Sequence, residues 1–256
     1  MTVKGREPAA ASPPRTRREP AACPLARPAP PRSRHIDCAR PGGSNAHMYT
    51  LYYSPGTASM VVHLALLEIG APYRLIKVDF EREEQRTPAY LALNPQGVVP
   101  TLIVDGRARV ESAALLLLLA ERHPQAGLAP PTGDPHRDEW YQWVVFLSNS
   151  LAATYRNWFY PRDLGSAEHP PLVRAALQGR IEAVWDRVDA HLARSGPYLL
   201  GADFSGADLL LTMLMRWSRN MPRTALDWPQ LRRLADLVRA RPSWRKLYEL
   251  EELTEW

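Results

Sequence analysis

The sequence predicts two domains in succession, a small α/β domain built on a mixed sheet and then an all-helical bundle. Three observations predict this fold class. Short aromatic and β-branched runs alternate with helical patterns over residues 49–123, a proline- and glycine-rich linker spans 126–135, and leucines and tryptophans then recur at helical spacing. A chain of 256 residues is long enough for each domain to bury its own core.

The first domain is predicted over residues 48–125 with the element order βαβαββα. Two parallel strands joined by a helix, followed by an antiparallel hairpin and a covering helix, make a small mixed sheet. The predicted strands are Tyr49–Tyr53, Tyr73–Val78, Thr101–Val104 and Ala108–Val110, and the predicted helices are Ala58–Ile69, Pro88–Leu93 and Ser112–His123.

Residues 126–135 are predicted to be a linker, and residues 136–256 an all-helical domain. Its helices are predicted at Asp134–Tyr155, Pro171–Ser195, Gly206–Met221, Gln230–Arg241 and Ser243–Glu252.

Residues 1–47 form a basic, proline-rich segment that carries nine Lys and Arg against three Asp and Glu. The segment lacks the apolar region of a secretory signal, and its nine prolines oppose the helix of a transit peptide. We interpret it as a disordered tail that lies upstream of a true translation start at Met48. The alternative is a docking segment for an SH3-like or anionic partner.

Charge and cysteine content exclude several classes of function. The tail accounts for the net charge of +5, so the folded part is near neutral and lacks the basic surface of a nucleic-acid-binding protein. Cys23 and Cys38 both lie in the tail, so the folded part has no disulfide, thiolate metal site or cysteine nucleophile, and we expect no metal.

The longest apolar run, Ala113–Ala120, is far shorter than the roughly 20 residues that span a bilayer. We therefore expect a soluble, cytoplasmic protein with no membrane or nucleic-acid partner.

The stretch NPQGVVPTL, residues 94–102, places Pro100 at the head of a predicted strand. Proline cannot donate to a strand ladder, so it is tolerated there only at an edge or in a cis turn. An ordinary turn before an edge strand remains the alternative.

Glu111 and Ser112 stand at the entry to the next predicted helix. A carboxylate beside free helix N-terminal N–H groups can bind an ammonium and a carboxylate together, which is the chemistry of an amino-acid end. A simple N-terminal cap is the alternative.

The runs YYSPGTAS, NPQGVVPTL and VESAALLLLLAERHP, in this order and spacing, resemble the glutathione transferase family, most closely the bacterial beta-type and related classes. The resemblance covers residues 48–256 and implies a thioredoxin-like first domain and a homodimer with a role in detoxification. It implies that Pro100 is cis, that the Val99 backbone pairs with the cysteinyl unit of glutathione, and that Glu111 and Ser112 hold the γ-glutamyl end.

The run GADFSGAD, residues 201–208, resembles the family's folding box, with Ser205 and Asp208 as a capping box worth about 1 kcal/mol of stability.

The loop Ser54–Ser59 is the predicted catalytic segment, because a helix N-terminus favours a glutathione thiolate. Ser59 is the first candidate for a hydroxyl that donates to the thiolate, with Tyr53 and Thr57 as substitutes. Lowering a thiol pKa from about 8.5 by two units takes roughly 2.7 kcal/mol of preferential anion stabilisation. Alternatively, Ser59 merely caps the helix. The loop departs from the beta-type pattern at Ala58, where those relatives carry cysteine.

The second domain departs from that pattern as well, because a beta-type histidine falls near Ala152. Tyr155, Arg156 and Trp158 are predicted to line the substrate site, where Arg156 favours an anionic substrate. Aromatic residues at this spacing are also typical of a helix core.

The sequence thus predicts a glutathione transferase that activates the thiolate of its co-substrate, glutathione, for attack on a small hydrophobic electrophile or a peroxide. The alternative is a noncatalytic interaction or regulatory protein of the same fold, which the two departures favour and the amino-acid site at Glu111 and Ser112 opposes. A glutaredoxin-like oxidoreductase is disfavoured because the domain lacks cysteine.

Overall fold

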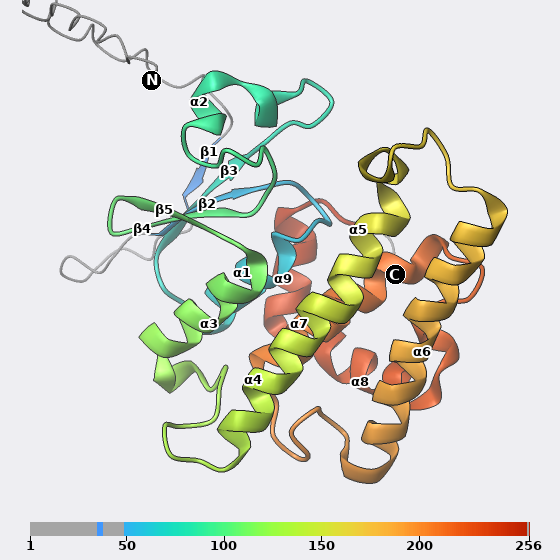
Figure 1. Ribbon diagram of the computed structural model, residues 1–256. Coiled ribbons are helices and arrows are strands. Elements are labelled where there is room, and N and C mark those ends of the chain that lie inside the picture. The colour runs from blue at the N-terminus through green and yellow to red at the C-terminus, as the bar shows by residue number, and fades with distance from the viewer. Residues whose placement is uncertain (1–34, 38–48, 255) are drawn as a thin grey trace, which may run out of the picture. The chain divides into compact units, whose positions relative to one another are not determined.

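The computed structural model describes residues 35–37, 49–254 and 256 (Figure 1). One five-stranded sheet runs in the order β1-β3-β2-β4-β5, in which β2 and β3 are parallel and the other neighbours are antiparallel. Its strands are β1 His35–Asp37, β2 Tyr49–Tyr53, β3 Tyr73–Lys77, β4 Thr101–Val104 and β5 Arg107–Val110. The four strands expected from the sequence are therefore all present, and the predicted mixed sheet is confirmed.

Strand β1 departs from the expectation of a wholly disordered tail. Residues 35–37 pair with the outer edge of β3, with Ile36 opposite Leu75. An edge strand presents a row of unpaired N–H and C=O groups, and an extended segment close to it in sequence can satisfy them. The rest of the predicted tail, residues 1–34 and 38–47, lies outside the described residues.

Helices cover both faces of the sheet. α1 Met60–Ile69 and α3 Ser112–Arg122 contact each other and share one core with Leu51 and Tyr53 of β2. The short α2 Pro88–Leu91 lies on the opposite face, where Tyr90 packs with Val78, Val99 and Tyr52. Alternate residues of β2 therefore serve opposite faces, as the period of two of a strand requires.

The second domain is helical throughout, as predicted. Its helices are α4 His136–Phe146, a π-helical turn Leu147–Ala152, α5 Ala153–Phe159, α6 Pro171–Ser195, α7 Gly206–Trp217, α8 Pro229–Arg239 and α9 Pro242–Leu250. Short 3-10 turns lie at Glu84–Arg86, Pro124–Ala126, Pro161–Leu164, Ser218–Asn220 and Ala225–Asp227. The helix expected at Asp134–Tyr155 begins at His136 and runs on to Phe159 through the π-helical turn.

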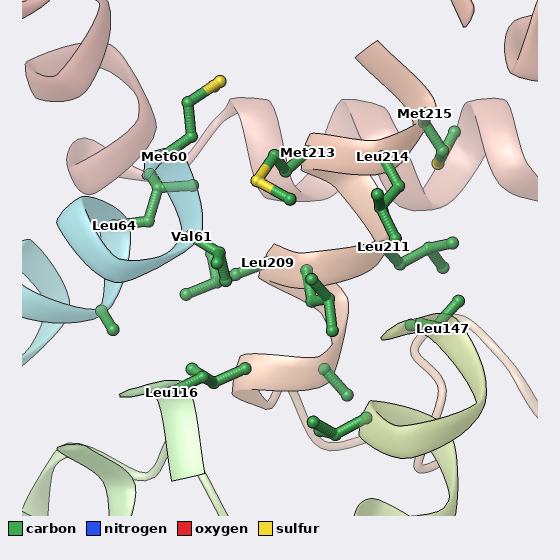
Figure 2. Packing of buried hydrophobic residues seen from close by; sticks show 14 of the residues in the cluster. Met60, Val61, Leu64, Leu116, Leu147, Leu209, Leu211, Met213, Leu214 and Met215 are labelled. Atoms are coloured by element: carbon green, nitrogen blue, oxygen red, sulfur yellow. The ribbon is translucent and has the colours of Figure 1, made fainter. Parts of the chain in front are cut away.

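α7 joins the two domains into one core. Every residue from Gly206 to Arg216 is buried, so this helix has no solvent face. Figure 2 shows Val61 of α1 and Leu116 of α3 beside Leu209 of α7, and all three belong to one buried cluster. A helix that is covered on all sides belongs to the interior, and here both domains supply its cover.

The predicted capping box at the start of α7 is confirmed. The Ser205 Oγ accepts from the Ala207 N–H at 3.2 Å, and the Asp208 Oδ2 accepts from the Ser205 N–H at 2.8 Å. Asp208 Oδ1 also accepts from the Leu199 N–H at 2.9 Å, which ties the preceding loop to the helix. Burial of the whole carboxyl raises the pKa of Asp208 to about 6, although these hydrogen bonds oppose the rise.

We predict a pH-dependent effect of Asp208→Asn. Between the ordinary pKa of aspartate and about 6, the folded state holds the proton that the unfolded state has lost, so wild-type stability falls as pH rises through this window. The unfolding free energy of wild type relative to Asp208→Asn should decline by about 2 to 3 kcal/mol from pH 4 to pH 7. Urea unfolding at both pH values measures it, and an unchanging difference would contradict the prediction.

Candidate functional site

The strand register brings the three motifs of the sequence to one edge of the sheet. Tyr52 of β2 lies opposite Thr101 of β4, and Thr101 lies opposite Val110 of β5. The loop that follows β2, the turn that precedes β4 and the helix start that follows β5 are therefore neighbours. These segments are residues 54–59, 98–100 and 111–112.

The turn before β4 is braced from within its own domain. The Val99–Pro100 peptide bond is cis, which confirms the prediction. The Val98 carbonyl accepts from Tyr90 Oη at 2.7 Å and from Asn94 Nδ2 at 2.8 Å. Burial raises the pKa of Tyr90 to about 12, so its hydroxyl keeps its proton and remains a donor at neutral pH. The turn is thus held by two donors on its inner side.

Glu111 adopts a backbone conformation that is rare for a residue with a side chain. Its φ is 70° and its ψ 107°, and such a conformation costs about 1 to 3 kcal/mol. Residues held in this way cluster at ligand sites. The exposed Glu111 carboxylate stands at the first turn of α3, beside the partly exposed Ser112, and Gln96 Nε2 lies 3.5 Å from its Oε1. An anion and a cation can therefore be bound side by side here.

The three candidate hydroxyls in and beside the loop of residues 54–59 differ in exposure. Ser59 is fully buried, and its hydroxyl donates to the Ser54 carbonyl at 3.1 Å. The Thr57 Oγ1 lies 2.9 Å from Ser59 Oγ and donates to the same carbonyl at 2.7 Å, but Thr57 is partly exposed. Tyr53 is 5 % exposed, and its ring packs against His63. Ser59 forms no side-chain cap of α1, so it acts as a tie within the loop.

Of the predicted substrate residues, the structure connects Tyr155 to the loop of residues 54–59. Tyr155 stacks on Phe159 with ring centroids 5.7 Å apart and meets Trp217 edge-on at 5.7 Å. Trp217 Nε1 in turn donates to the Gly56 carbonyl at 3.2 Å. Burial raises the pKa of Tyr155 far above its ordinary value, so it stays neutral. Phe159 is 47 % exposed, so an apolar face of this aromatic group reaches solvent.

The contacts of Arg156 and Trp158 lead away from the loop. Arg156 Nε donates to Asp163 Oδ2 at 2.6 Å, and its guanidinium lies 3.9 Å from the Tyr160 ring centroid. Trp158 is 6 % exposed and lies beneath Arg174 of α6. These contacts do not support the predicted substrate roles of the two residues.

Phe159 and Trp217, which form this aromatic group with Tyr155, are not among the residues that the sequence predicts for the site. Phe159 lies four residues after Tyr155, on the same helix face, and that spacing is a signal that could have found it. Trp217 is the last residue of α7, and nothing in its local pattern sets it apart from a core tryptophan.

Among residues 35–37, 49–254 and 256, no group of three or more His, Cys, Asp or Glu side chains is placed to hold a metal ion. In the same part of the chain, no helix combines the length and the apolar character that crossing a membrane requires.

Comparison with known proteins assigns the family. The model of the glutathione S-transferase N-terminal domain matches residues 49–127, and that of the glutathione S-transferase C-terminal domain matches residues 171–249. Glutathione S-transferase GST-4.5 of Xanthomonas campestris pv. campestris is 31% identical over 171 residues, which cover 66% of this chain and 81% of that protein. The chain belongs to the glutathione S-transferase family. Family membership confirms the predicted fold class and the predicted enzyme class, glutathione transferase.

Two further relatives of this glutathione transferase are informative. A maleylacetoacetate isomerase of Pseudomonas aeruginosa is 32% identical over 214 residues, which cover 78% of this chain and 94% of that protein. The crystal structure of a glutathione transferase homolog from Sulfitobacter, with bound glutathione, matches with a TM-score of 0.72 and 31% identity over 80% of this chain and 99% of that one.

The turn before β4 of this glutathione transferase depends on Gly97, whose φ is 63°. A Cβ there would lie 3.0 Å from the Gln85 carbonyl oxygen and 2.9 Å from Arg86 Nη1. Gly127 has a similar φ of 65° but no atom within 4 Å of such a Cβ, so it is the matched control.

We predict that Gly97→Ala lowers the unfolding free energy by about 1 to 3 kcal/mol more than Gly127→Ala, because only the first variant adds crowding to the cost of positive φ. Urea unfolding of both variants measures the difference. Equal losses would show that the turn tolerates a side chain.

Proposed function

We propose that the protein binds glutathione along the sheet edge formed by residues 54–59, 98–100 and 111–112, and that it activates the thiol there. The convergence of these three segments is the observation that carries the proposal. Each offers the chemistry of one part of the tripeptide.

Glu111 and Ser112 hold the γ-glutamyl end in this proposal. The Glu111 carboxylate pairs with the ammonium group, and the Ser112 hydroxyl and the first N–H groups of α3 receive the carboxylate. The Val99 backbone pairs with the cysteinyl unit. The two hydrogen bonds to the Val98 carbonyl keep that backbone in place.

The proposed thiolate donor is Thr57, because full burial keeps Ser59 from the sulfur. When the Thr57 hydroxyl turns from the Ser54 carbonyl to the thiolate, the Ser59 hydroxyl still donates to that carbonyl, so no buried acceptor loses its partner. No described residue accepts from the Ala58 N–H, which stands just before α1 and offers a second donor. The positive end of α1 adds to the stabilisation of the anion.

The electrophile lies against Phe159 and Trp217, with Tyr155 behind them. The thiolate attacks its electron-poor carbon, a C–S bond forms, and a leaving group departs or the adduct takes up a proton. Because Ala58 replaces cysteine, the loop forms no mixed disulfide at that position. Conjugation or peroxide reduction therefore fits the site better than disulfide exchange.

Isomerisation is the second candidate, because a relative 32% identical to the chain is named maleylacetoacetate isomerase. Addition of a thiolate to a cis-alkene, rotation and loss of the thiolate would use the same groups, and glutathione would be returned unchanged.

The proposal includes a cytoplasmic homodimer. Tyr141 and Val145 leave apolar surface on α4, whose neighbour α3 is tied to it by the Tyr141–Glu121 hydrogen bond. Mass determination by light scattering tests the dimer.

We predict that wild type binds glutathione with a thiol pKa well below the usual value of about 8.5, and that Thr57→Ala raises it by about one unit. Glu111→Ala should weaken binding about tenfold without moving the thiol pKa, because it acts at the other end of the ligand. Calorimetry and the ultraviolet absorbance of the thiolate over pH measure both quantities.

Thr132→Ala, in the exposed linker, is the matched control. A lowered pKa that rises in Ser59→Ala but not in Thr57→Ala would return the donor role to Ser59. No binding at millimolar glutathione would favour the noncatalytic alternative.

We predict that the enzyme joins glutathione to an aryl chloride activated by nitro groups, with one glutathione consumed per product. Mass spectrometry of the product and titration of residual thiol measure this. A cis-alkene flanked by two carbonyls, converted to its trans isomer with all glutathione recovered, would instead support isomerisation.

A further inference from the structure

The helical domain holds both polar backbone groups of Gly56 in the catalytic loop. The Gly56 N–H donates to Glu251 Oε2 at 3.0 Å, and the Gly56 carbonyl accepts from Trp217 Nε1 at 3.2 Å. Gly56 has a φ of 70°, and a Cβ there would lie 2.9 Å from Arg216 Nη1, so the loop approaches this domain as closely as glycine allows. Thr57, the proposed thiolate donor, is the next residue.

Glu251 belongs to a buried hydrogen-bond chain that the proposed function does not use. Its Oε1 lies 2.8 Å from His63 Nδ1, and the side chains of both residues are 0 % exposed. His63 Nε2 lies 3.1 Å from the Tyr73 hydroxyl. The chain Glu251–His63–Tyr73 therefore runs from the end of α9 through α1 to β3. Buried polar groups are tolerated when they are hydrogen-bonded, and such a network specifies one arrangement of the elements that contribute to it.

α9 lies along α1 (Figure 1), and side-chain hydrogen bonds join the two helices near both ends of α9. At the far end from the loop, Arg241 Nε and Nη2 donate to the Glu68 carboxylate at 2.8 and 2.9 Å. At the near end, Glu251 contacts His63 and Gly56. Both sets of hydrogen bonds join α1 to α9, but only the set made by Glu251 includes a residue of the catalytic loop.

We propose that Glu251 is a positioning residue for thiol activation, acting through Gly56 to fix the loop that carries Thr57 and the Ala58 N–H. The inference rests on the proposed function. It makes the end of α9, which lies 195 residues from Gly56 in sequence, a part of the glutathione site.

A positioning role and a purely electrostatic role of Glu251 predict opposite changes in the thiol pKa when Glu251 is replaced by alanine. If Glu251 acted only through its negative charge, removing that charge would favour the thiolate, so Glu251→Ala and Glu251→Gln would both lower the thiol pKa. If Glu251 holds the loop, Glu251→Ala releases Gly56 and raises the thiol pKa. Glu251→Gln retains both contacts, because its amide oxygen accepts from Gly56 and its amide nitrogen donates to His63 Nδ1.

The test measures the thiol pKa of bound glutathione by thiolate absorbance, together with kcat and KM for glutathione, in the full chain. We expect Glu251→Ala to raise the thiol pKa by about one unit, which lowers the thiolate fraction and kcat about tenfold at a pH below both pKa values, with KM changed less than threefold. Glu251→Gln should behave as wild type. Trp217→Phe, which keeps an aromatic side chain but removes the N–H donor to the Gly56 carbonyl, should show a smaller rise.

Two controls separate positioning from stability. Glu68→Ala removes the hydrogen bonds between Glu68 and Arg241, far from the loop, and should lower the free energy of unfolding without changing the thiol pKa. Glu249→Ala alters an exposed residue at the end of the same helix and should change neither. If Glu251→Ala does not fold, Glu251→Gln and Trp217→Phe still decide the matter.

A thiol pKa in Glu251→Ala equal to or below that of wild type would overturn the inference while leaving the proposed function intact. An equal rise in Glu68→Ala would also overturn it, because general loosening would then explain the effect. Absence of glutathione binding by wild type would overturn both.

Discussion

The burial of α7 is the constraint on which the rest of the structure depends. This helix is apolar along nearly its whole length, and neither domain alone covers it. Packing against α1 and α3 completes its cover, so the sheet domain and the helical domain share one core. If the domains separated, one side of this helix would be exposed to water, and each Å² of exposed apolar surface would cost about 25 cal/mol of free energy. The two domains are therefore held in one relation to each other.

That shared core decides where the loop of residues 54–59, the proposed catalytic loop, lies. α1 is packed between the sheet and α7, so its N-terminus is fixed relative to both domains. The loop that precedes α1 is held by hydrogen bonds within itself and by hydrogen bonds to the helical domain. Ser59 and Thr57 bond to Ser54 within the loop, while Glu251 and Trp217 hold Gly56 from the helical domain. The proposed site, where the two domains meet, combines a polar edge for glutathione with an aromatic surface for the electrophile.

The sheet edge proposed to bind glutathione could be predicted because its determinants are local. Gly97, Pro100 and Glu111 belong to turns or helix starts, where a few neighbouring residues set the backbone, and the strand order then brings these turns together. Ser59 and Trp158 show the limit of the same reasoning. Both belong to segments that the sequence predicts to form the site, but the direction of each side chain depends on what packs above it, and Trp158 meets α6.

The sequence by itself determined the two-domain organisation, the order of the predicted elements, the capping box of α7 and the three motifs that meet at one edge of the sheet. These follow from periodicity, turn chemistry and capping, which act over a few residues. Only the tertiary structure decided which hydroxyl of the loop reaches solvent, that Phe159 and Trp217 form the aromatic surface, and that Glu251 contacts Gly56. Each of these depends on contacts between residues far apart in the chain, whose direction and burial are settled when the helices pack, so no local pattern records them.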